Sequence, residues 1–501
     1  MAIAYHAQQR GDYPAIVSAF GERTYAELNA NANRVARMLR DAGLKPGDGI
    51  AVVSRNRPEF VEILSAAERA GFRFTPINAH LKAEEIGYIG DNCEAKAFFA
   101  DASLAGAVVG ALRYMPNVKL SLAFGGKVEG YQVYEERIAS HEGRDIDDPV
   151  FGSYMGYTSG STGRPKGVIR QGFKPFQPRW GNTPDQFTPY SDVALCTGPV
   201  YHAAPFVMNV VTPLVSAATV VMMDGWDAEE TLRLIDKHRV THTHLVPTML
   251  YRLLQLPDTV KQRYDLSSLK YVIHGAAPCP VHVKRGMIDW WGPIIWEYYG
   301  STEGDAGMLV DSHEWLKKPG TLGRPDQAYE NKIVDDNGDE LPAGEVGTLY
   351  TKAPPEGHFA YFKSSEKTDN AFKGDHFTVG DMGYFDEDGY LFLTGRSAEL
   401  IISGGVNIYP QEVDDQLLKH PAVLDVCTIG VADEEWGEVV KSVVQLNAGY
   451  DADDTLSAQL IAWARENLAH YKCPKIIDYI NELPRLSSGK VQRAMLRDYQ
   501  G

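Results

Sequence analysis

The chain has 501 residues, of which 44% are hydrophobic and 23% are charged, and its formal net charge is −17. This length exceeds the size at which a single hydrophobic core keeps growing, so we expect two or more domains. The acidic balance excludes a general nucleic-acid binder, whose surface needs a basic field, but it allows a local basic pocket. The cysteines are widely scattered without metal-ligand or redox spacing, which indicates reduced thiols: Cys93, Cys196, Cys279, Cys427 and Cys473.

The two ends of the chain show no targeting or membrane signal. The first ten residues have no long apolar run and lack the order of positive charge followed by apolar residues that is typical of a signal peptide. No window reaches the ~18 apolar residues of a membrane helix, and the last three residues match no peroxisomal or retention tripeptide. We therefore expect a cytoplasmic location and no transmembrane segment.

The first 320 residues alternate between helical and extended patterns. Thr24 and Glu27 form a capping box that predicts the start of a helix, and Gly43 predicts its end. Alternation of helices and strands predicts a mainly parallel sheet covered by helices. Further predicted elements are strands over residues 50–53, 72–77 and 218–223 and helices over residues 58–70 and 228–238.

The character of the chain changes near residue 330. Short strand patterns surround a turn at Asn337-Gly338, which predicts a small antiparallel unit. The last hundred residues have the size of an independent α+β domain. Their predicted elements are strands over residues 423–430 and 439–446 and a helix over residues 455–468.

We therefore predict an α/β protein with two domains. The large N-terminal domain covers residues 1–396 and combines helix-covered, mostly parallel sheets with the small antiparallel β unit. Its sub-regions are about 1–150, 151–320 and 321–396. A small α+β C-terminal domain covers residues 397–501.

Residues 157–167, Tyr-Thr-Ser-Gly-Ser-Thr-Gly-Arg-Pro-Lys-Gly, have the composition of a polyphosphate-binding loop. Glycines let backbone N–H groups approach an anion, hydroxyl groups donate to phosphate oxygens, and Lys166 supplies a positive charge. The order differs from a Walker loop, because Gly167 follows the lysine instead of Ser or Thr. Taken alone, the segment also fits a flexible polar surface loop. The predicted ligands are Thr158, Ser159, Gly160, Ser161, Thr162, Gly163 and Lys166.

Four further clusters follow this loop along the chain. They are Tyr-Tyr-Gly-Ser-Thr-Glu at 298–303, Thr-Val-Gly-Asp at 378–381, Gly-Arg followed by Leu-Ile-Ile-Ser-Gly-Gly-Val-Asn-Ile-Tyr-Pro at 395–410, and Leu-Ser-Ser-Gly-Lys at 486–490. In that order, the set resembles the adenylate-forming superfamily of acyl-CoA synthetases, luciferases and peptide-synthetase adenylation domains. The resemblance runs essentially from Thr24 to Arg497.

The resemblance implies an ATP-dependent acid–thiol ligase. Such an enzyme forms an acyl-adenylate and pyrophosphate, transfers the acyl group to coenzyme A and releases AMP. The substrates would be a small-molecule carboxylic acid, ATP and CoA, with Mg²⁺ as the metal ion. Nucleic acid is not an expected partner, and the sequence leaves a homodimer open.

The resemblance also assigns roles in adenylation. Glu303 matches the magnesium-binding acid, Thr302 a residue that contacts the α-phosphate, and Lys490 the lysine that reaches the acyl carboxylate. Asp381 matches the acid that accepts hydrogen bonds from the ribose hydroxyls, and Arg396 assists at the same sugar. Tyr299 would lie on one face of adenine and residues 275–277 on the other. The remaining predicted nucleotide contacts are Gly275, Ala276, Ala277, Tyr298, Gly300 and Ser301.

Taken alone, each of these residues also fits a structural role that involves no catalysis. Glu303 is then a solvated or helix-capping acid, Asp381 a turn former, Tyr299 a core residue and Lys490 part of a basic tail. Their joint occurrence in the order of the family favours the catalytic reading.

In the family, the C-terminal domain turns about a hinge before thioester formation. The turn withdraws the lysine and presents Gly404 and Gly405, which leave room for a pantetheine arm. The same pair also fits an ordinary hairpin turn. Ala398 occupies the hinge position, where the family often has Lys or Asp. The resemblance extends the predicted CoA site to Ser403, Gly404, Gly405, Trp436 and Lys472.

The predicted acyl pocket is apolar. Amino-acid-activating relatives carry an acid where this chain has Ala203, Ala204 and Phe206, so a hydrophobic carboxylate is expected: a medium- or long-chain fatty acid or a bulky ring acid. His202 resembles a residue at the gate between the ATP and acyl sites, and it also fits a core histidine. The segment 172–184 fits a substrate-side loop or a surface insertion. The predicted pocket residues are Tyr201, Ala204, Phe206, Val207, Met249, His274 and Gly304.

Other functions remain open from the sequence. The alternatives are an adenylating enzyme that loads a free-standing carrier protein, an aryl-CoA ligase and a non-catalytic nucleotide-binding protein. The presence of Lys490 and Glu303 argues against the last of these. Nothing in the sequence supports a luciferase-type oxygenase.

Overall fold

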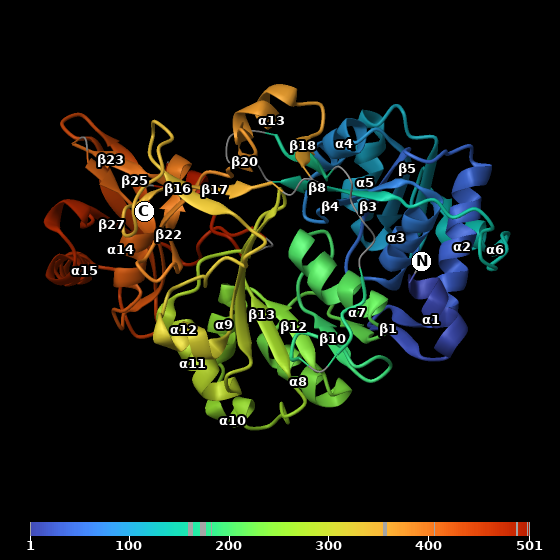
Figure 1. Ribbon diagram of the computed structural model, residues 1–501, viewed down its shortest axis with the longest axis horizontal. Coiled ribbons are helices and arrows are strands. Elements are labelled where there is room, and N and C mark those ends of the chain that lie inside the picture. The colour runs from blue at the N-terminus through green and yellow to red at the C-terminus, as the bar shows by residue number, and fades with distance from the viewer. Residues whose placement is uncertain are drawn as a thin grey trace.

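Helix-covered sheets form the larger, N-terminal part of the protein, and a smaller part follows it in the chain (Figure 1). The structure is a computed structural model, and it describes residues 2–158, 164–170, 177–181, 183–353, 358–404, 406–486, 489–497 and 499. None of the helices in these ranges is both long and apolar enough to cross a membrane.

The first large sheet has helices on both faces. Ile50 and Val52 pack against helices α2 and α3, whereas Ala51 and Val53 face α4 and α5. Burial on both faces explains the continuous apolar pattern of the central strand. The sheet runs in the order β18 (Phe359–Tyr361), β9 (Lys166–Arg170), β8 (Ser153–Thr158), β4 (Arg73–Ile77), β3 (Gly49–Val53), β5 (Ala95–Asp101), β6 (Leu120–Phe124) and β7 (Gln132–Val133). Its helices are α2 (Tyr25–Asp41), α3 (Pro58–Ala70), α4 (Ala83–Asn92), α5 (Ala105–Ala111) and α6 (Tyr134–Ala139).

The second large sheet includes the first two strands of the chain. Strand β1 pairs in parallel with β11, which lies about two hundred residues later. The sheet runs in the order β15 (Asp305–Val310), β14 (Ile295–Gly300), β13 (Tyr271–His274), β12 (His242–Leu245), β10 (Val193–Cys196), β11 (Thr219–Met222), β1 (Pro14–Ser18) and β2 (Gly21–Thr24). Around it lie α1 (Ala2–Arg10), α7 (Thr212–Val215), α8 (Ala228–His238), α9 (Pro247–Leu254), α10 (Asp258–Lys261), α11 (Val281–Trp291) and α12 (Ser312–Lys317).

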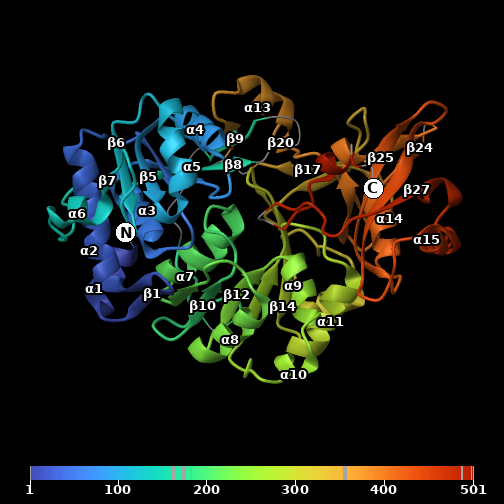
Figure 2. The ribbon, with the colours of Figure 1, turned by 180° about the vertical axis from the view of Figure 1, so that it is seen from behind.

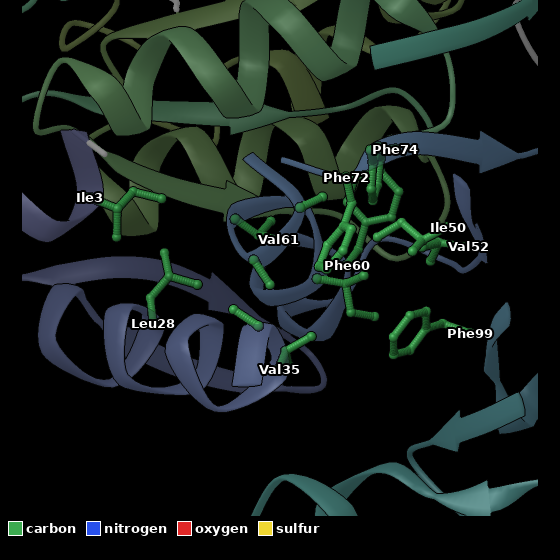
Figure 3. Close-up of a cluster of buried hydrophobic side chains, with 14 of the residues drawn as sticks. Ile3, Leu28, Val35, Ile50, Val52, Phe60, Val61, Phe72, Phe74 and Phe99 are labelled. Atoms are coloured by element: carbon green, nitrogen blue, oxygen red, sulfur yellow. The ribbon is translucent and has the colours of Figure 1, made fainter. Parts of the chain in front are cut away.

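One hydrophobic cluster joins the two large sheets. It contains Leu28, Val35, Phe60 and Phe74 from the first 150 residues, and Figure 3 shows these side chains converging. The same cluster takes in the buried face of the π-helix Pro205–Val211. This π-helix therefore sits in the core that fixes the two sheets relative to each other. Segments of this kind occur frequently at functional sites.

A small antiparallel sheet follows, as the sequence predicts. The strand expected after Asn337-Gly338 reduces to a bridge between Val334 and Glu340. Pro342 lacks the N–H group that would extend the pairing. The sheet runs in the order β19 (Phe372–Lys373), β20 (His376–Phe377), β17 (Gly347–Lys352), β21 (Asp381–Phe385) and β22 (Leu391–Arg396), with β16 (Asn331–Val334) on β17 and α13 (Ser365–Ala371) nearby.

The C-terminal part has its own sheet and core. Helices α14 and α15 pack on the sheet through Val413, Leu417, Leu456 and Leu460. The strands run in the order β24 (Val406–Ile408), β23 (Ile401–Ser403), β26 (Gly437–Leu446) and β25 (Val423–Asp433), with β27 (Ile476–Tyr479) on β26; the helices are α14 (Pro410–Leu417) and α15 (Asp454–Asn467).

The predicted fold class is confirmed, with a large N-terminal α/β part followed by a small α+β part. Helices α3 and α8 have the predicted bounds. The predicted capping box of α2 is present, since Thr24 and Glu27 each accept a hydrogen bond from the other's backbone N–H. Local signals of this kind are readable because both partners lie in one turn.

We predict that Tyr25→Phe destabilises the junction between the two large sheets. The buried Tyr25 hydroxyl lies 3.1 Å from the carbonyl oxygen of Leu214 and 2.9 Å from that of Ala218. Its loss removes a buried hydrogen-bond donor from these carbonyls, which costs about 1 kcal/mol. Urea unfolding measures the change, with Tyr450→Phe at an exposed site as the control. Equal stability of the two variants would contradict the assignment.

Candidate active site

The predicted phosphate loop joins two antiparallel strands. Thr158, the last residue of β8, is paired directly with Lys166, the first residue of β9. The predicted ligands between them, Ser159, Gly160, Ser161, Thr162 and Gly163, lie outside the described residues.

A tight turn at residues 301–304 lies against this hairpin. The turn is closed by a hydrogen bond from the Ser301 N–H to the Gly304 carbonyl at 2.8 Å. Arg170 on β9 donates to the carbonyl oxygen of Thr302 at 3.1 Å. A Cβ atom on Gly156 would lie 3.3 Å from the Thr302 side chain. The predicted phosphate contact Thr302 thus lies against β8 and β9, the strands that flank the predicted phosphate loop.

Glu303 is buried in this turn and accepts a hydrogen bond from the Tyr361 hydroxyl at 2.9 Å. The described residues contain no cluster of three or more His, Cys, Asp or Glu side chains that would hold a metal ion by itself. A single carboxylate combined with substrate phosphates is the arrangement that Mg²⁺ commonly takes in nucleotide sites. Glu303 therefore fits the predicted magnesium ligand.

Asp381 is the centre of a second cluster. Strands β21 and β22 pair Asp381 directly with Arg396, and the Arg396 Nε donates to Asp381 Oδ1 at 2.8 Å. The Tyr299 hydroxyl donates to Asp381 Oδ2 at 2.6 Å. Burial, and then the Asp381 charge, raise the pKa of Tyr299, so this hydroxyl keeps its proton. A carboxylate has about four acceptor positions, so each oxygen can still accept from a ribose hydroxyl.

The predicted adenine wall contains an unusual backbone conformation. Ala276 has φ of +69°, which a residue with a side chain adopts at a cost. The preceding Gly275 packs so closely on Tyr298 that a Cβ atom would lie 2.5 Å from its ring. The structure thus places the predicted residues Gly275, Ala276 and Ala277 directly after β13, beside the end of β14 that carries Tyr298, Tyr299 and Gly300.

Lys490 belongs to the C-terminal part and extends toward the cluster around Asp381. Figure 2 shows the red end of the chain running back toward the N-terminal part. A Cβ atom on the neighbouring Gly489 would lie 2.7 Å from Thr248 Oγ1, and Arg252 forms an ion pair with Glu482 at 3.5 Å. Burial and the Arg396 charge lower the pKa of Lys490, whereas Glu399 and Asp381 oppose that change. The predicted lysine therefore lies within electrostatic reach of the predicted ribose acid.

Two arginines fix the ends of the Lys490 segment. Arg485 donates to the Gly489 carbonyl at 2.5 Å and pairs with Asp425. The half-buried Arg493 pairs with Asp414 at 2.7 Å and with Glu399, next to the predicted hinge, at 3.2 Å. The sequence analysis missed this role, because the two acidic partners lie about 60 and 80 residues before their arginines.

The predicted acyl pocket residues divide into two groups. Phe206 is buried between Tyr154, at 4.7 Å between ring centroids, and Phe74, at 6.3 Å. These rings border a cavity of about 40 Å³. The cavity is lined by Leu64, Glu68, Phe74, Phe151, Gly152, Ser153, Tyr154, Phe206 and Val211. Tyr201, Ala204 and Val207 lie on the same segment as Phe206.

The other predicted pocket residues lie elsewhere around the second sheet. Met249 packs in the hydrophobic cluster of α9, and a Cβ atom on Gly304 would lie 2.4 Å from the Phe377 ring. His274 is wholly buried, with its Nε2 3.7 Å from Glu297, which also pairs with the buried Lys284 at 2.7 Å. His274 thus belongs to a charged cluster against α11.

Burial favours the neutral form of two histidines, His202 at the predicted gate and His244 on β12. Burial, with a smaller effect of His80, lowers the pKa of His202 to about 4. Burial also lowers the pKa of His244 to about 4. The His244 Nε2 lies 3.2 Å from the Tyr298 hydroxyl. The sequence analysis did not single out His244, because a histidine inside a buried strand gives no local signal of its contact with the next strands.

The strands next to the predicted CoA residues Ser403 and Gly404 lie on the outer side of the C-terminal part. Figure 1 shows β23, and Figure 2 shows β24, far from β8. Gly404 follows β23 with φ of +57°, and its N–H donates to the Trp436 carbonyl at 2.8 Å. Ser403 ends β23, and Lys472 pairs with Glu412 at 2.7 Å. The predicted Gly405 lies outside the described residues, and the predicted hinge Ala398 lies in a short 3₁₀ helix, Ser397–Glu399.

Comparison with known proteins decides the family. Residues 3–357 match the AMP-binding enzyme family, and residues 412–490 match the AMP-binding enzyme C-terminal domain. The chain belongs to the AMP-binding enzyme family. This result confirms that the chain is a member of the adenylate-forming superfamily, as the sequence predicts. It also confirms the predicted enzyme class, acid–thiol ligase. The CoA ligases of this family use ATP, Mg²⁺ and CoA.

This AMP-binding enzyme is similar to several characterised ligases along nearly its whole length. A feruloyl-CoA synthase from Amycolatopsis is 33% identical over 485 residues, covering 95% of this chain and 93% of that protein. An indoleacetate–CoA ligase from Aromatoleum aromaticum is 32% identical, covering 95% and 94%. The crystal structure of ATP-bound MatB from Rhodopseudomonas palustris matches with a TM-score of 0.82 at 29% identity, covering 99% and 98%.

We predict that Gly404→Val impairs thioester formation more than adenylation. A Cβ atom at this position would lie 2.8 Å from the Trp436 ring, and valine rarely adopts positive φ. We expect CoA-dependent turnover to fall at least about tenfold, because the turn beside Trp436 must shift, which corresponds to about 1.4 kcal/mol. Pyrophosphate exchange should stay within twofold of wild type. Unchanged CoA turnover would reject this turn as part of the CoA site.

Proposed function

We propose that this AMP-binding enzyme is an ATP-dependent acyl-CoA synthetase for ring-bearing hydrophobic carboxylic acids. The observation that carries the proposal is that Lys490 lies within electrostatic reach of Asp381 and Arg396. Asp381 also accepts from Tyr299, and Glu303 and Lys166 lie in the neighbouring turn and hairpin. Positive charge, a metal-binding acid and a ribose acceptor thus surround the end of β14.

In the proposed first step, a carboxylate oxygen of the acid attacks the α-phosphorus of ATP. The bond from that phosphorus to the pyrophosphate oxygen breaks, and pyrophosphate leaves. Lys166 and the hairpin would hold the β- and γ-phosphates, Thr302 would contact the α-phosphate, and Asp381 would hold the ribose. A magnesium ion bound by Glu303 would neutralise phosphate charge. Catalysis then rests on alignment and on charge neutralisation.

Lys490 would contribute through its charge. A single charge ~4 Å from a developing anion is worth about 4 kcal/mol at an effective dielectric of roughly 20. That free energy corresponds to roughly a thousandfold in rate. Arg485 and Arg493 would hold the lysine in position, so that little reorganisation is needed during the reaction.

In the proposed second step, the CoA thiolate attacks the acyl carbon and AMP leaves. The Gly404 turn lies on the outer side of the C-terminal part, so this part would have to rotate to bring the turn to the acyl-adenylate. We propose Ala398 as the hinge and residues 1–396 and 397–501 as the two domains. The gap between the family matches, residues 358–411, contains this position. We also propose a cytoplasmic location, and the homodimer stays open.

The aromatic stack around Phe206 favours a ring-bearing acid. Phe206 lies nearly parallel to Tyr154 and to Phe74, with interplanar angles of 18° and 15°. A long alkyl chain needs an extended apolar tunnel, whereas Phe74, Tyr154 and Phe206 pack in the hydrophobic core between the two sheets. Flat rings pack well against such aromatic faces. The names of the feruloyl and indoleacetate ligases agree with a ring-bearing acid as the substrate. Both names also include CoA, which favours free CoA over a carrier protein as the acyl acceptor.

We expect Lys490→Ala to separate the two half-reactions. The variant should lose about a thousandfold in ATP–pyrophosphate exchange, because one charge near the α-phosphate is removed. It should convert supplied acyl-adenylate and CoA to the thioester within threefold of the wild-type rate. Quench-flow measurement of both steps tests this, and equal loss in the two steps would refute the assigned role.

An acid panel tests the substrate class. The panel contains hydroxycinnamates, indole-3-acetate, benzoate, decanoate and palmitate, each assayed for AMP and acyl-CoA. We expect the ring acids to give the highest kcat/KM and palmitate the lowest. The highest kcat/KM with palmitate would contradict the ring-acid proposal but not the CoA-ligase activity.

We further predict that Phe206→Ala shifts the preference toward longer acids. Removing the ring opens space beside the cavity, so kcat/KM for decanoate relative to a hydroxycinnamate should rise about tenfold, or about 1.4 kcal/mol. Phe206→Tyr keeps the ring and serves as the control. An unchanged ratio would show that Phe206 does not limit the length of the acid.

A further inference from the structure

Tyr361 connects two charged residues that the sequence analysis assigned separately. Its hydroxyl donates to Glu303 at 2.9 Å, and the Lys166 Nζ lies 4.8 Å from the centre of its ring. Glu303 is the proposed magnesium ligand, and Lys166 is the proposed ligand of the terminal phosphates. No sequence motif on which the family assignment was based includes Tyr361.

The backbone around Tyr361 is firmly held next to the phosphate-loop hairpin. Strand β18 pairs with β9, which sets Tyr361 opposite Val168, and the Phe362 N–H donates to the Gly167 carbonyl at 2.8 Å. The Tyr361 N–H donates to the Thr368 hydroxyl at 2.9 Å. The ring also packs edge-on against Phe359. The ring position is therefore set by strand pairing and packing, and does not depend on a flexible loop.

The two charges on either side of Tyr361 attract each other. Lys166 contacts the ring of Tyr361 and Glu303 contacts its hydroxyl, and the two charged residues form no ion pair with each other in the described part of the chain. Burial and the Lys367 charge lower the pKa of Lys166, whereas the Glu303 charge opposes that change. A direct pair would use the lysine charge that the phosphates need and the carboxylate oxygens that a cation needs. Breaking a partly buried ion pair on substrate binding would oppose binding.

We propose that Tyr361 is a positioning residue that keeps Lys166 and Glu303 apart and available for MgATP. The ring face offers the ammonium group a cation–π contact in place of the carboxylate. The hydroxyl donates to one carboxylate oxygen and fixes the orientation of Glu303, which leaves the other oxygen for the cation. Burial raises the pKa of Tyr361, so the hydroxyl remains a donor at neutral pH. This inference rests on the proposed adenylating function.

The test uses Tyr361→Phe and isothermal titration of nucleotides. The variant keeps the ring and loses only the donor to Glu303. We expect the Kd of MgATP to rise about tenfold, or about 1.4 kcal/mol, and the Mg²⁺ concentration needed for half-saturation to rise with it. The Kd of AMP should stay within twofold, because AMP uses Asp381, Arg396 and Tyr299 and lacks the terminal phosphates.

Two further variants separate positioning from simple packing. Tyr384→Phe removes the hydroxyl of a half-buried tyrosine that stacks on Phe392 away from this site, and should leave the Kd of MgATP unchanged. In a Glu303→Gln background, adding Tyr361→Phe should have much less effect on MgATP binding than in wild type, because the two residues act through one contact.

Three outcomes would overturn the proposal. They are a Kd of MgATP within twofold of wild type, an equal loss of AMP and MgATP affinity, and a full additive effect of Tyr361→Phe in the Glu303→Gln background. In each case, wild-type protein that still forms acyl-CoA would leave the proposed function intact. Failure of the wild-type protein to bind MgATP would instead refute the proposed function.

Discussion

The docking of the Lys490 segment against the N-terminal part is the constraint on which the proposed mechanism depends. Gly489 packs on Thr248 at the start of α9, and Lys490 lies near Asp381 and Arg396. Arg485 and Arg493 attach the same segment to Asp425 and Asp414 in the body of the C-terminal part. The lysine is therefore positioned by the C-terminal part as a whole, and the proposed rotation of that part would remove it from the proposed nucleotide site.

Each of the two functional carboxylates accepts a hydrogen bond from a tyrosine hydroxyl. Asp381 accepts from Tyr299 on one oxygen and pairs with Arg396 on the other, and each oxygen retains an acceptor position. Glu303 accepts from Tyr361, whose ring lies against Lys166. In both clusters a tyrosine hydroxyl, kept protonated by burial, donates to the functional carboxylate. Such preorganisation reduces the rearrangement that a polyanionic substrate would otherwise require.

The sequence correctly predicted those structural features that residues close together in the chain determine. The capping box of Thr24 and Glu27, and the bounds of α3 and α8, follow from residues within one helix. The pairing of β1 with β11 was not predictable, because the hydrophobic pattern of a strand does not specify a partner two hundred residues away. The strand after Asn337-Gly338 shrank to a bridge, since tertiary context overrides a turn signal.

The candidate site shows the same division. Glu303, Asp381, Arg396 and Lys490 were named from motifs, whereas Tyr361 and Arg493 depend on pairings across long stretches of chain. His274 was expected in the acyl pocket, and its contact with Glu297 arises from strand register that the sequence does not display.

Cross-linking the docked arrangement tests the central claim most directly. A Cβ atom on Gly489 would lie 3.9 Å from Thr248 Cβ, close to the ~3.8 Å that a disulfide requires. The account predicts that a protein carrying Thr248→Cys and Gly489→Cys, once oxidised, still forms acyl-adenylate and pyrophosphate but makes no thioester until it is reduced. Thioester formation by the cross-linked protein at the rate of its reduced form would contradict the account.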